Sequence, residues 1–126
     1  LLARVVEMME ALPLDDADLM GDIYEHMLGR IASAGQNGQF RTPRHIIALM
    51  VEMTRPTPRD VIVDPASGTC GFVAVAAAFL FRHHPEALLD AATRRHIHHG
   101  MFHGYDFDRT MLRIGTMNMM THGIED

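Results

Sequence analysis

The sequence predicts an α/β fold in which an N-terminal helical segment leads into the first part of a parallel sheet. Apolar residues recur at helical spacing through the first 54 residues. A short β-branched run, Val61–Val63, then passes through a glycine-containing turn into an apolar helix. Phe102–Asp106 is expected to form a second strand, parallel to the first because a helical connection separates them. An all-parallel sheet needs more strands and two covered faces, so the sequence predicts a fold that stops part-way.

Two helices are expected before the sheet. The first spans Leu2–Leu12 and ends at Pro13, which cannot continue a helix. The second is capped by Asp15 or Asp16 and runs to about Ala34. A polar loop then leads to Thr42 and Pro43, which predict a third helix with a hydroxyl cap and proline at its first position; that helix is expected to continue through Met53.

The remaining elements alternate between helix and strand. They are the strand Val61–Val63, a helix from Gly71 to about Arg82, a helix plus loop over Pro85–His99, the strand Phe102–Asp106, and a helix capped by Asp108 that runs to about His122 with Gly123 as its C-cap. This order divides the chain into a helical segment, residues 1–42, and the start of an α/β domain, residues 43–126.

The turn after the first strand indicates a ligand site. Gly68 and Gly71 permit close approach of a ligand, whereas Asp64 would repel a pyrophosphate. No Gly-Lys-Ser/Thr follows, which excludes a P-loop for nucleoside triphosphates. A carboxylate beside a glycine turn suits a cofactor with a cationic end and a neutral sugar, such as S-adenosylmethionine. The alternative is a tight turn that binds nothing.

A second carboxylate, Asp106, is expected at the tip of the second strand. In that position it can accept hydrogen bonds from both ribose hydroxyls. Its alternative role is the N-cap of the last helix, for which Asp108 competes.

Composition narrows the remaining possibilities. The net charge of −5 gives no basic footprint for unaided DNA binding. The nine histidines show no metal-binding spacing, so no metal site is expected and the cluster at His96, His98 and His99 is assigned to a surface loop. The single cysteine, Cys70, is interpreted as a small turn residue rather than a nucleophile, and it fits a reducing cytoplasm. No apolar run approaches the ~20 residues of a membrane span. The first residue is Leu1 rather than Met, so a fragment of a longer protein is expected.

Four motifs in order carry a resemblance to a known family. They are Gly38-Gln39-Phe40-Arg41-Thr42-Pro43-Arg44, Asp64-Pro65-Ala66-Ser67-Gly68-Thr69-Cys70-Gly71-Phe72, Gly104-Tyr105-Asp106, and Gly115-Thr116-Met117-Asn118-Met119-Met120-Thr121-His122-Gly123-Ile124. With Tyr24-Glu25 upstream, this pattern resembles the modification (methyltransferase) subunit of type I restriction–modification systems, a group of N6-adenine DNA methyltransferases. The resemblance implies a Rossmann-like S-adenosylmethionine-dependent methyltransferase fold, here truncated.

The resemblance also assigns roles to residues. It implies that Asp64 and the turn from Gly68 to Gly71 hold the methionine part of the cofactor, that Asp106 takes the ribose hydroxyls, and that Thr42 contacts the methionine carboxylate. The full set of implied cofactor-binding residues is Phe40, Thr42, Pro43, Asp64, Pro65, Ser67, Gly68, Thr69, Gly71 and Asp106. Cys70 departs from the family's usual glycine.

The family's catalytic motif, Asn/Asp-Pro-Pro-Tyr/Phe, does not occur in the 126 residues. We therefore expect no catalytic residue and no methylation from this chain alone. The resemblance implies that DNA is engaged through the full complex, with a specificity subunit and a restriction nuclease subunit as partners. The alternative function is a noncatalytic scaffold whose helices dock a partner and whose glycine turn is only structural.

Overall fold

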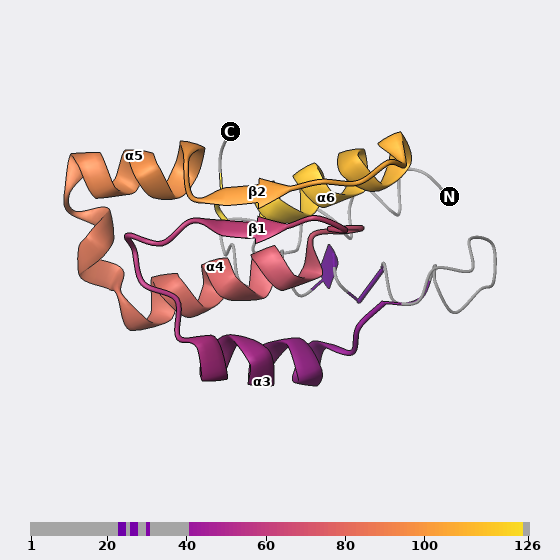
Figure 1. Cartoon of the computed structure of the whole chain (residues 1–126), viewed down its shortest axis with the longest axis horizontal. Helices are drawn as coiled ribbons and strands as arrows, with labels where there is room; N and C mark the ends of the chain where they lie inside the picture. Colours follow the sequence, from indigo (N-terminus) through magenta and orange to yellow (C-terminus); the bar gives the residue numbers. More distant parts are fainter. Residues whose placement is uncertain (1–22, 25, 28–29, 31–40, 125–126) are drawn as a thin grey trace, which may run out of the picture.

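A computed structural model describes residues 23–24, 26–27, 30 and 41–124. Its elements, labelled as in Figure 1, are α3 (Arg44–Thr54), β1 (Ile62–Asp64), α4 (Gly71–His83), the 3-10 helix η1 (Pro85–Leu88), α5 (Ala91–His99), β2 (Phe102–Gly104) and α6 (Arg109–Thr121). The expected helix Leu2–Leu12 and the predicted site residue Phe40 lie outside the described residues, and the described residues of the second expected helix, 23–24, 26–27 and 30, are helical. Among the helices that are described, none is long and apolar enough to cross a membrane.

The two strands pair in parallel, as predicted, with Ile62 opposite Phe102 and Asp64 opposite Gly104. Both strands are shorter or shifted relative to the prediction. β1 begins one residue later and includes Asp64, and β2 ends at Gly104 rather than Asp106. The last backbone hydrogen bond of the ladder runs from the Tyr105 N–H to the Asp64 carbonyl oxygen (2.9 Å), and residues 105 and 106 no longer belong to the strand.

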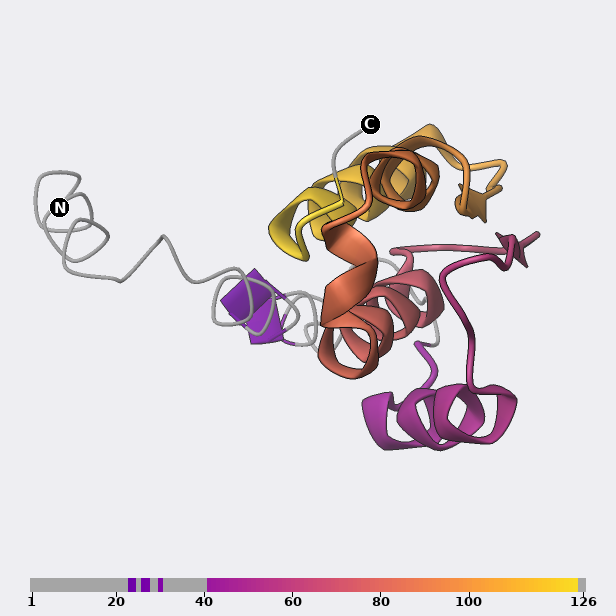
Figure 2. The same ribbon diagram turned by 90° about the vertical axis from the view of Figure 1, so that its left-hand side faces the viewer.

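Helices cover one face of this small sheet, as Figure 2 shows. The core has two clusters of buried apolar side chains, one around Leu80 and Met101 and one between α3 and α4. On the covered face of the sheet, Ile62 and Phe102 pack against both clusters. On the other face Val61 and Val63 are each 57% exposed. Because parallel sheets are normally buried on both sides, this open face supports the expectation of a sheet that is incomplete within the described residues.

Helix α4 is the centre of the core. Ala74, Ala77 and Leu80 are almost completely buried along it, and Ile97 and Met101 reach the same cluster from α5 and the start of β2. The alanines let neighbouring elements approach closely. The predicted span of this helix is confirmed to within one residue at its end.

The start of α3 differs from the prediction. The helix begins at Arg44 with Pro43 as its N-cap residue, and no side chain caps it. Pro43 has an extended ψ of 136°, and its carbonyl oxygen already accepts from the Ile46 and Ile47 N–H groups (2.9 and 3.2 Å). Thr42 is therefore one residue too early for its hydroxyl to cap the helix.

The segment from Pro85 to His99 is two helices with a break between them. The break is fixed by Asp90, whose carboxylate accepts from the Thr93 N–H (2.8 Å) and caps α5. The assignment of the histidine cluster to a surface loop was wrong, because His96, His98 and His99 form the last turn of α5.

Both ends of α6 follow the predicted chemistry. The Asp108 carboxylate caps the helix by accepting from the Thr110 N–H (2.8 Å). Gly123, with φ of +77°, follows the C-cap residue His122 by one position. The Gly123 and Ile124 N–H groups donate to Met120 and Met119 (3.1 Å each), which is the paired bonding of a Schellman motif.

Candidate cofactor site

The predicted site residues gather at the carboxyl ends of β1 and β2. The helices α4 and α6 begin at the same end of the sheet (Figure 1). In open parallel sheets this edge is where ligands bind, because loops after successive strands meet there.

The turn after β1 is joined to the loop after β2 by hydrogen bonds. The Ser67 N–H and hydroxyl both donate to the Tyr105 carbonyl oxygen, at 2.9 and 3.2 Å. Ser67 is only 6% exposed, so its side chain has a structural task in this arrangement. The Cys70 N–H donates to the Ser67 carbonyl oxygen (2.7 Å) and closes the turn.

Asp106 links the two loops directly. Its Oδ2 accepts from the Gly68 N–H (2.9 Å), and its Oδ1 accepts from the Asp108 N–H (2.8 Å). Each carboxylate oxygen has a further lone pair, so Asp106 can still accept a hydroxyl hydrogen bond from a ligand. Sequence reasoning placed Asp106 and Gly68 in one site, and this bond joins them across 38 residues.

Asp64 stabilises the first half of the turn. Its Oδ1 accepts from the Ala66 N–H (3.1 Å), while its backbone carbonyl oxygen remains in the sheet ladder. The carboxylate is half-buried beside the turn, and Pro65 after it is exposed. Asp64 and Asp106 therefore put two negative charges beside the same turn.

The two glycines of the turn have different tasks. Gly68 adopts φ of +51°, and a Cβ built on it would meet no heavy atom within 4 Å, so this position faces open space. A Cβ on Gly71 would lie 3.5 Å from the Ile47 Cδ1 of α3, so Gly71 lets α3 and α4 approach closely. Only Gly68 offers its backbone to an approaching ligand.

The first turn of α3 thus lies against the start of α4. Thr42 and Pro43, which precede α3, are exposed at that end of the helix. The hydroxyl of Thr42 does not cap α3.

Cys70 is the N-cap residue of α4 and has a left-handed backbone, φ of +59°, that side-chain-bearing residues rarely adopt. Burial is the largest effect and raises the pKa of its thiol, the hydrogen bond with Ser67 opposes this, and the charges of Asp64 and Asp106 add smaller increases. The thiol is therefore protonated at neutral pH, which argues against a nucleophilic role.

Two residues of the site were not found by sequence reasoning. Phe107, directly after Asp106, is 99% exposed, which is unusual for an aromatic side chain. An aromatic residue directly after a strand-end carboxylate is the signal that could have identified it. The other is Asn118, which is fully buried and donates from Nδ2 to the Thr69 carbonyl oxygen (2.8 Å).

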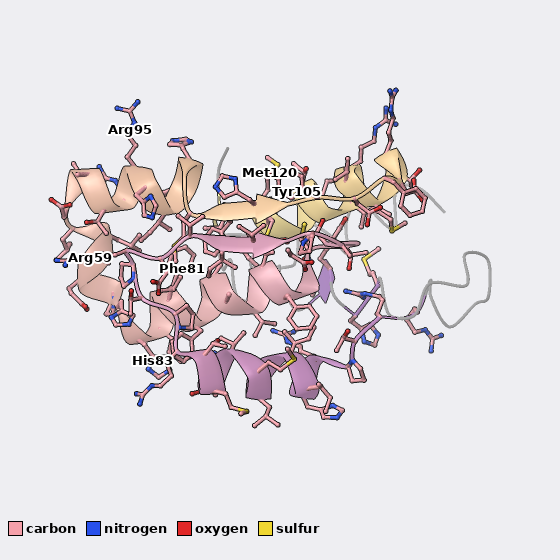
Figure 3. All side chains as sticks on the ribbon, in the orientation of Figure 1. Arg59, Phe81, His83, Arg95, Tyr105 and Met120 are labelled. Atoms are coloured by element: carbon pink, nitrogen blue, oxygen red, sulfur yellow. The ribbon has the colours of Figure 1, made fainter. Side chains whose placement is uncertain are left out.

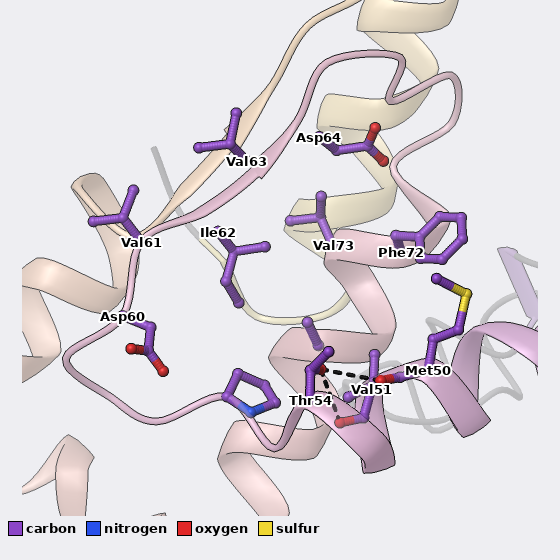
Figure 4. Close-up of a pocket in the computed structure, with 12 residues that line it drawn as sticks. Met50, Val51, Thr54, Asp60, Val61, Ile62, Val63, Asp64, Phe72 and Val73 are labelled. Atoms are coloured by element: carbon purple, nitrogen blue, oxygen red, sulfur yellow. Dashed lines mark hydrogen bonds between the residues drawn. The ribbon is translucent and has the colours of Figure 1, made fainter.

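A groove of about 510 Å³ lies between α3 and β1 and borders the turn at Asp64 (Figure 4). Its lining is largely apolar, with Asp64 and Phe72 at one end and Asp60 at the other. The Thr54 hydroxyl donates within α3, to Met50 and Val51 carbonyl oxygens (3.0 and 3.2 Å).

No three histidine, cysteine or acidic side chains of the described residues come close enough to hold a metal ion.

Comparison with known proteins identifies the family of this chain. Residues 15–126 match the family described as N-6 DNA Methylase. The chain belongs to this family. It is 36% identical over 107 residues to the type I restriction enzyme EcoEI methylase subunit of Escherichia coli, and 32% identical over 118 residues to the HindI methylase subunit of Haemophilus influenzae. The resemblance to type I modification subunits is thereby confirmed.

These relatives are much longer than the chain. The matches cover 85% and 92% of this N-6 DNA methylase family member but only 21% and 24% of the EcoEI and HindI subunits. Solved structures give the same picture. The chain is similar to the EcoKI M protein (TM-score 0.65, 32% identity, 72% of this chain and 19% of the other). It is also similar to a modification subunit of a putative type I restriction enzyme from Vibrio vulnificus (TM-score 0.76, 26% identity, 99% and 26%).

Proposed function

We propose that this chain carries most of the S-adenosylmethionine site of a site-specific N6-adenine DNA methyltransferase subunit from a type I restriction–modification system. The observation that carries the proposal is the hydrogen bond from the Gly68 N–H to the Asp106 carboxylate. It joins the glycine turn after β1 to the acid after β2, the two parts that sequence reasoning assigned to one cofactor.

The residues at this edge fit the cofactor chemically. The sulfonium and ammonium groups of S-adenosylmethionine are cations, and Asp64 and Asp106 supply negative charge on either side of the turn. Gly68 faces open space, which permits close approach of the methionine part. Asp106 accepts the ribose hydroxyls, and the exposed ring of Phe107 stacks on the adenine.

Thr42 and Pro43 complete the site from the side of α3 in this proposal. The Thr42 hydroxyl contacts the methionine carboxylate, and Phe40 belongs to the same loop. Three further residues shape the turn. The Ser67 hydroxyl and the Thr69 carbonyl oxygen make hydrogen bonds, and Gly71 leaves room for α3 because it has no side chain.

When bound, the cofactor supplies an activated methyl group. We propose that its transfer to an adenine amine uses residues beyond these 126, since the Asn/Asp-Pro-Pro-Tyr/Phe motif is not among them. In this proposal the further strands of a Rossmann-like sheet pair with the outer edges of β1 and β2, and further helices cover the open face at Val61 and Val63. The glycine turn stays accessible in that arrangement because it lies beyond the strand ends.

DNA contact is assigned to the complex of modification, specificity and restriction subunits. The net charge of −5 gives this chain no general attraction for phosphates. Figure 3 shows Arg95 pointing outward from α5, at the opposite end of the sheet from the turn. The cofactor edge carries Asp64, Asp106 and Asp108 together with Arg109 at the start of α6.

One observation favours the scaffold alternative. Both Asp106 oxygens already accept from backbone N–H groups, as they would in a purely structural turn. Exposed apolar side chains on α3, including Leu49, Met50 and Met53, would then dock a partner.

Calorimetric titration of the chain with S-adenosylmethionine separates the two functions. The cofactor proposal predicts saturable binding that is lost or weakened about tenfold in Asp64→Ala, with no binding of NAD, whose pyrophosphate Asp64 repels. Asp60→Ala is the matched control, because Asp60 is an exposed aspartate away from the turn. A folded chain that binds no S-adenosylmethionine would favour the scaffold.

A further inference from the structure

The motif Gly115–Ile124 contains the buried Asn118 and supplies no residue that would itself touch the cofactor. It forms the second half of α6 and the helix end, and it lies directly beneath the glycine turn through two contacts. Neither contact involves the two carboxylates or the exposed ring that would touch the cofactor.

The first contact is a buried hydrogen bond. Asn118 has no exposed surface, and its Nδ2 donates to the Thr69 carbonyl oxygen at 2.8 Å, across 49 residues of chain. Thr69 lies between Gly68 and Cys70, both of which have left-handed backbones. The bond therefore holds the turn at its most strained part.

The second contact is a close fit of side chain and glycine. A Cβ on Gly115 would lie 2.6 Å from the Cys70 Sγ and 3.2 Å from the Gly68 carbonyl oxygen. The thiol thus occupies the space that a side chain at Gly115 would need. Since Cys70 replaces a glycine common in the family, the missing side chain on α6 accommodates the added one in the turn.

The end of the motif fixes the backbone of Asn118. The Asn118 carbonyl oxygen accepts from the Thr121 hydroxyl (2.8 Å) and from the ring Nδ1 of His122 (2.8 Å), and His122 is 8% exposed. Gly123 then ends the helix, and Ile124 returns to the core. Thr121 and His122 thus hold the residue that contacts the turn.

We infer that Gly115–Ile124 is the positioning element of the cofactor-binding turn, with Asn118 as its central positioning residue. The inference rests on the proposed S-adenosylmethionine site. Asn118 fixes the direction of the Thr69 carbonyl, whose peptide plane also carries the Cys70 N–H that closes the turn, and Gly115 admits the Cys70 side chain. The element acts on the methionine part of the cofactor, which the turn holds, and not on the adenosine part.

The test compares two ligands in the Asn118→Leu variant, which keeps the side-chain size and removes the donor. S-adenosylmethionine should bind about tenfold more weakly, the loss expected when one buried hydrogen bond leaves its acceptor unsatisfied. 5′-Methylthioadenosine, which lacks the amino-acid part, should keep its affinity. Ile97→Val is the control for general destabilisation, because Ile97 is 1% exposed in α5 and outside the turn.

Amide hydrogen exchange provides a second readout that needs no ligand. In Asn118→Leu, exchange at residues 67–71 should rise about tenfold relative to exchange in α5, whereas Ile97→Val should show no such local rise. If Asn118→Leu does not fold, Gly115→Ala, which displaces the turn through Cys70, is measured in the same two ways.

The outcomes separate the inference from the proposed function. Equal weakening of both ligands, or exchange that rises uniformly, would overturn the positioning role and leave Asn118 as an ordinary core residue. If the wild-type chain bound neither ligand, the proposed cofactor function would fail. A local rise in exchange would then still establish that the motif holds the turn, and a uniform one would reject it.

Discussion

The close contact between Gly115 and Cys70 predicts that the effect of Gly115→Ala on the free energy of unfolding depends on the Cys70 side chain. Replacing Gly115 by Ala places a methyl group 2.6 Å from the Cys70 Sγ, far inside van der Waals contact. Overpacking of this kind costs roughly 1–3 kcal/mol, while alanine in a helix interior gains roughly 1 kcal/mol over glycine. Gly115→Ala should therefore lower the free energy of unfolding by about 1 kcal/mol, the difference between these effects.

The same change should be harmless when Cys70 is replaced by Gly. Removing the thiol leaves only the Gly68 carbonyl oxygen, at 3.2 Å, close to the new methyl group. In the Cys70→Gly background the helix propensity of alanine then dominates, so Gly115→Ala should be neutral or stabilising by up to about 1 kcal/mol. The coupling between the two sites is then about 1–2 kcal/mol, within the range seen for contacting residues.

Urea unfolding of the four chains measures this coupling. Wild type, Gly115→Ala, Cys70→Gly and the double variant form one cycle, and each midpoint with its slope gives a free energy of unfolding. An equal cost of Gly115→Ala in both backgrounds would refute the reasoning, because it would mean that the Cys70 side chain does not occupy the space beside Gly115.

Three further predictions concern the same edge of the molecule. Phe107→Ala should weaken S-adenosylmethionine binding by roughly 1–3 kcal/mol in calorimetry, the range for base stacking on an aromatic ring, and should leave stability unchanged; an unaltered affinity would exclude stacking. Asp108→Ala removes the cap of α6 and should lower the free energy of unfolding, measured in urea, by about 1 kcal/mol; an unchanged value would contradict a stabilising cap. The folded chain holds the Cys70 proton more tightly than the unfolded chain does, so stability should fall as the pH rises above the thiol's ordinary pKa of 9.0; Cys70→Ala should show less of this fall, and identical pH profiles would contradict the raised pKa.

Much of the fold followed from local chemistry. Asp108 and Gly123 marked the ends of α6 because capping depends on a few neighbouring residues, and the structure confirms both. Thr42 showed the same signal for α3, but Pro43 is extended and accepts the first helical bonds itself, which moves the helix start by one residue. Sequence alone does not specify the ψ angle that decides between the two.

The candidate site was only partly predictable. Gly68 and Asp106 were assigned to one site because the ends of parallel strands share an edge, and the hydrogen bond between them agrees with that assignment. The contacts of Asn118 with Thr69 and of Gly115 with Cys70 depend on how α6 packs beneath the turn. That packing joins residues far apart in the sequence, so no local sequence pattern predicts it.

The central claim is that the turn after β1 and the loop after β2 form one S-adenosylmethionine site. The most direct test follows backbone amide resonances of the isotope-labelled chain during titration with S-adenosylmethionine. The account predicts saturable shifts at residues 67–71 and at Tyr105, Asp106 and Phe107, with little change in α5. Shifts confined to the groove between α3 and β1, or no shifts in a folded chain, would contradict it.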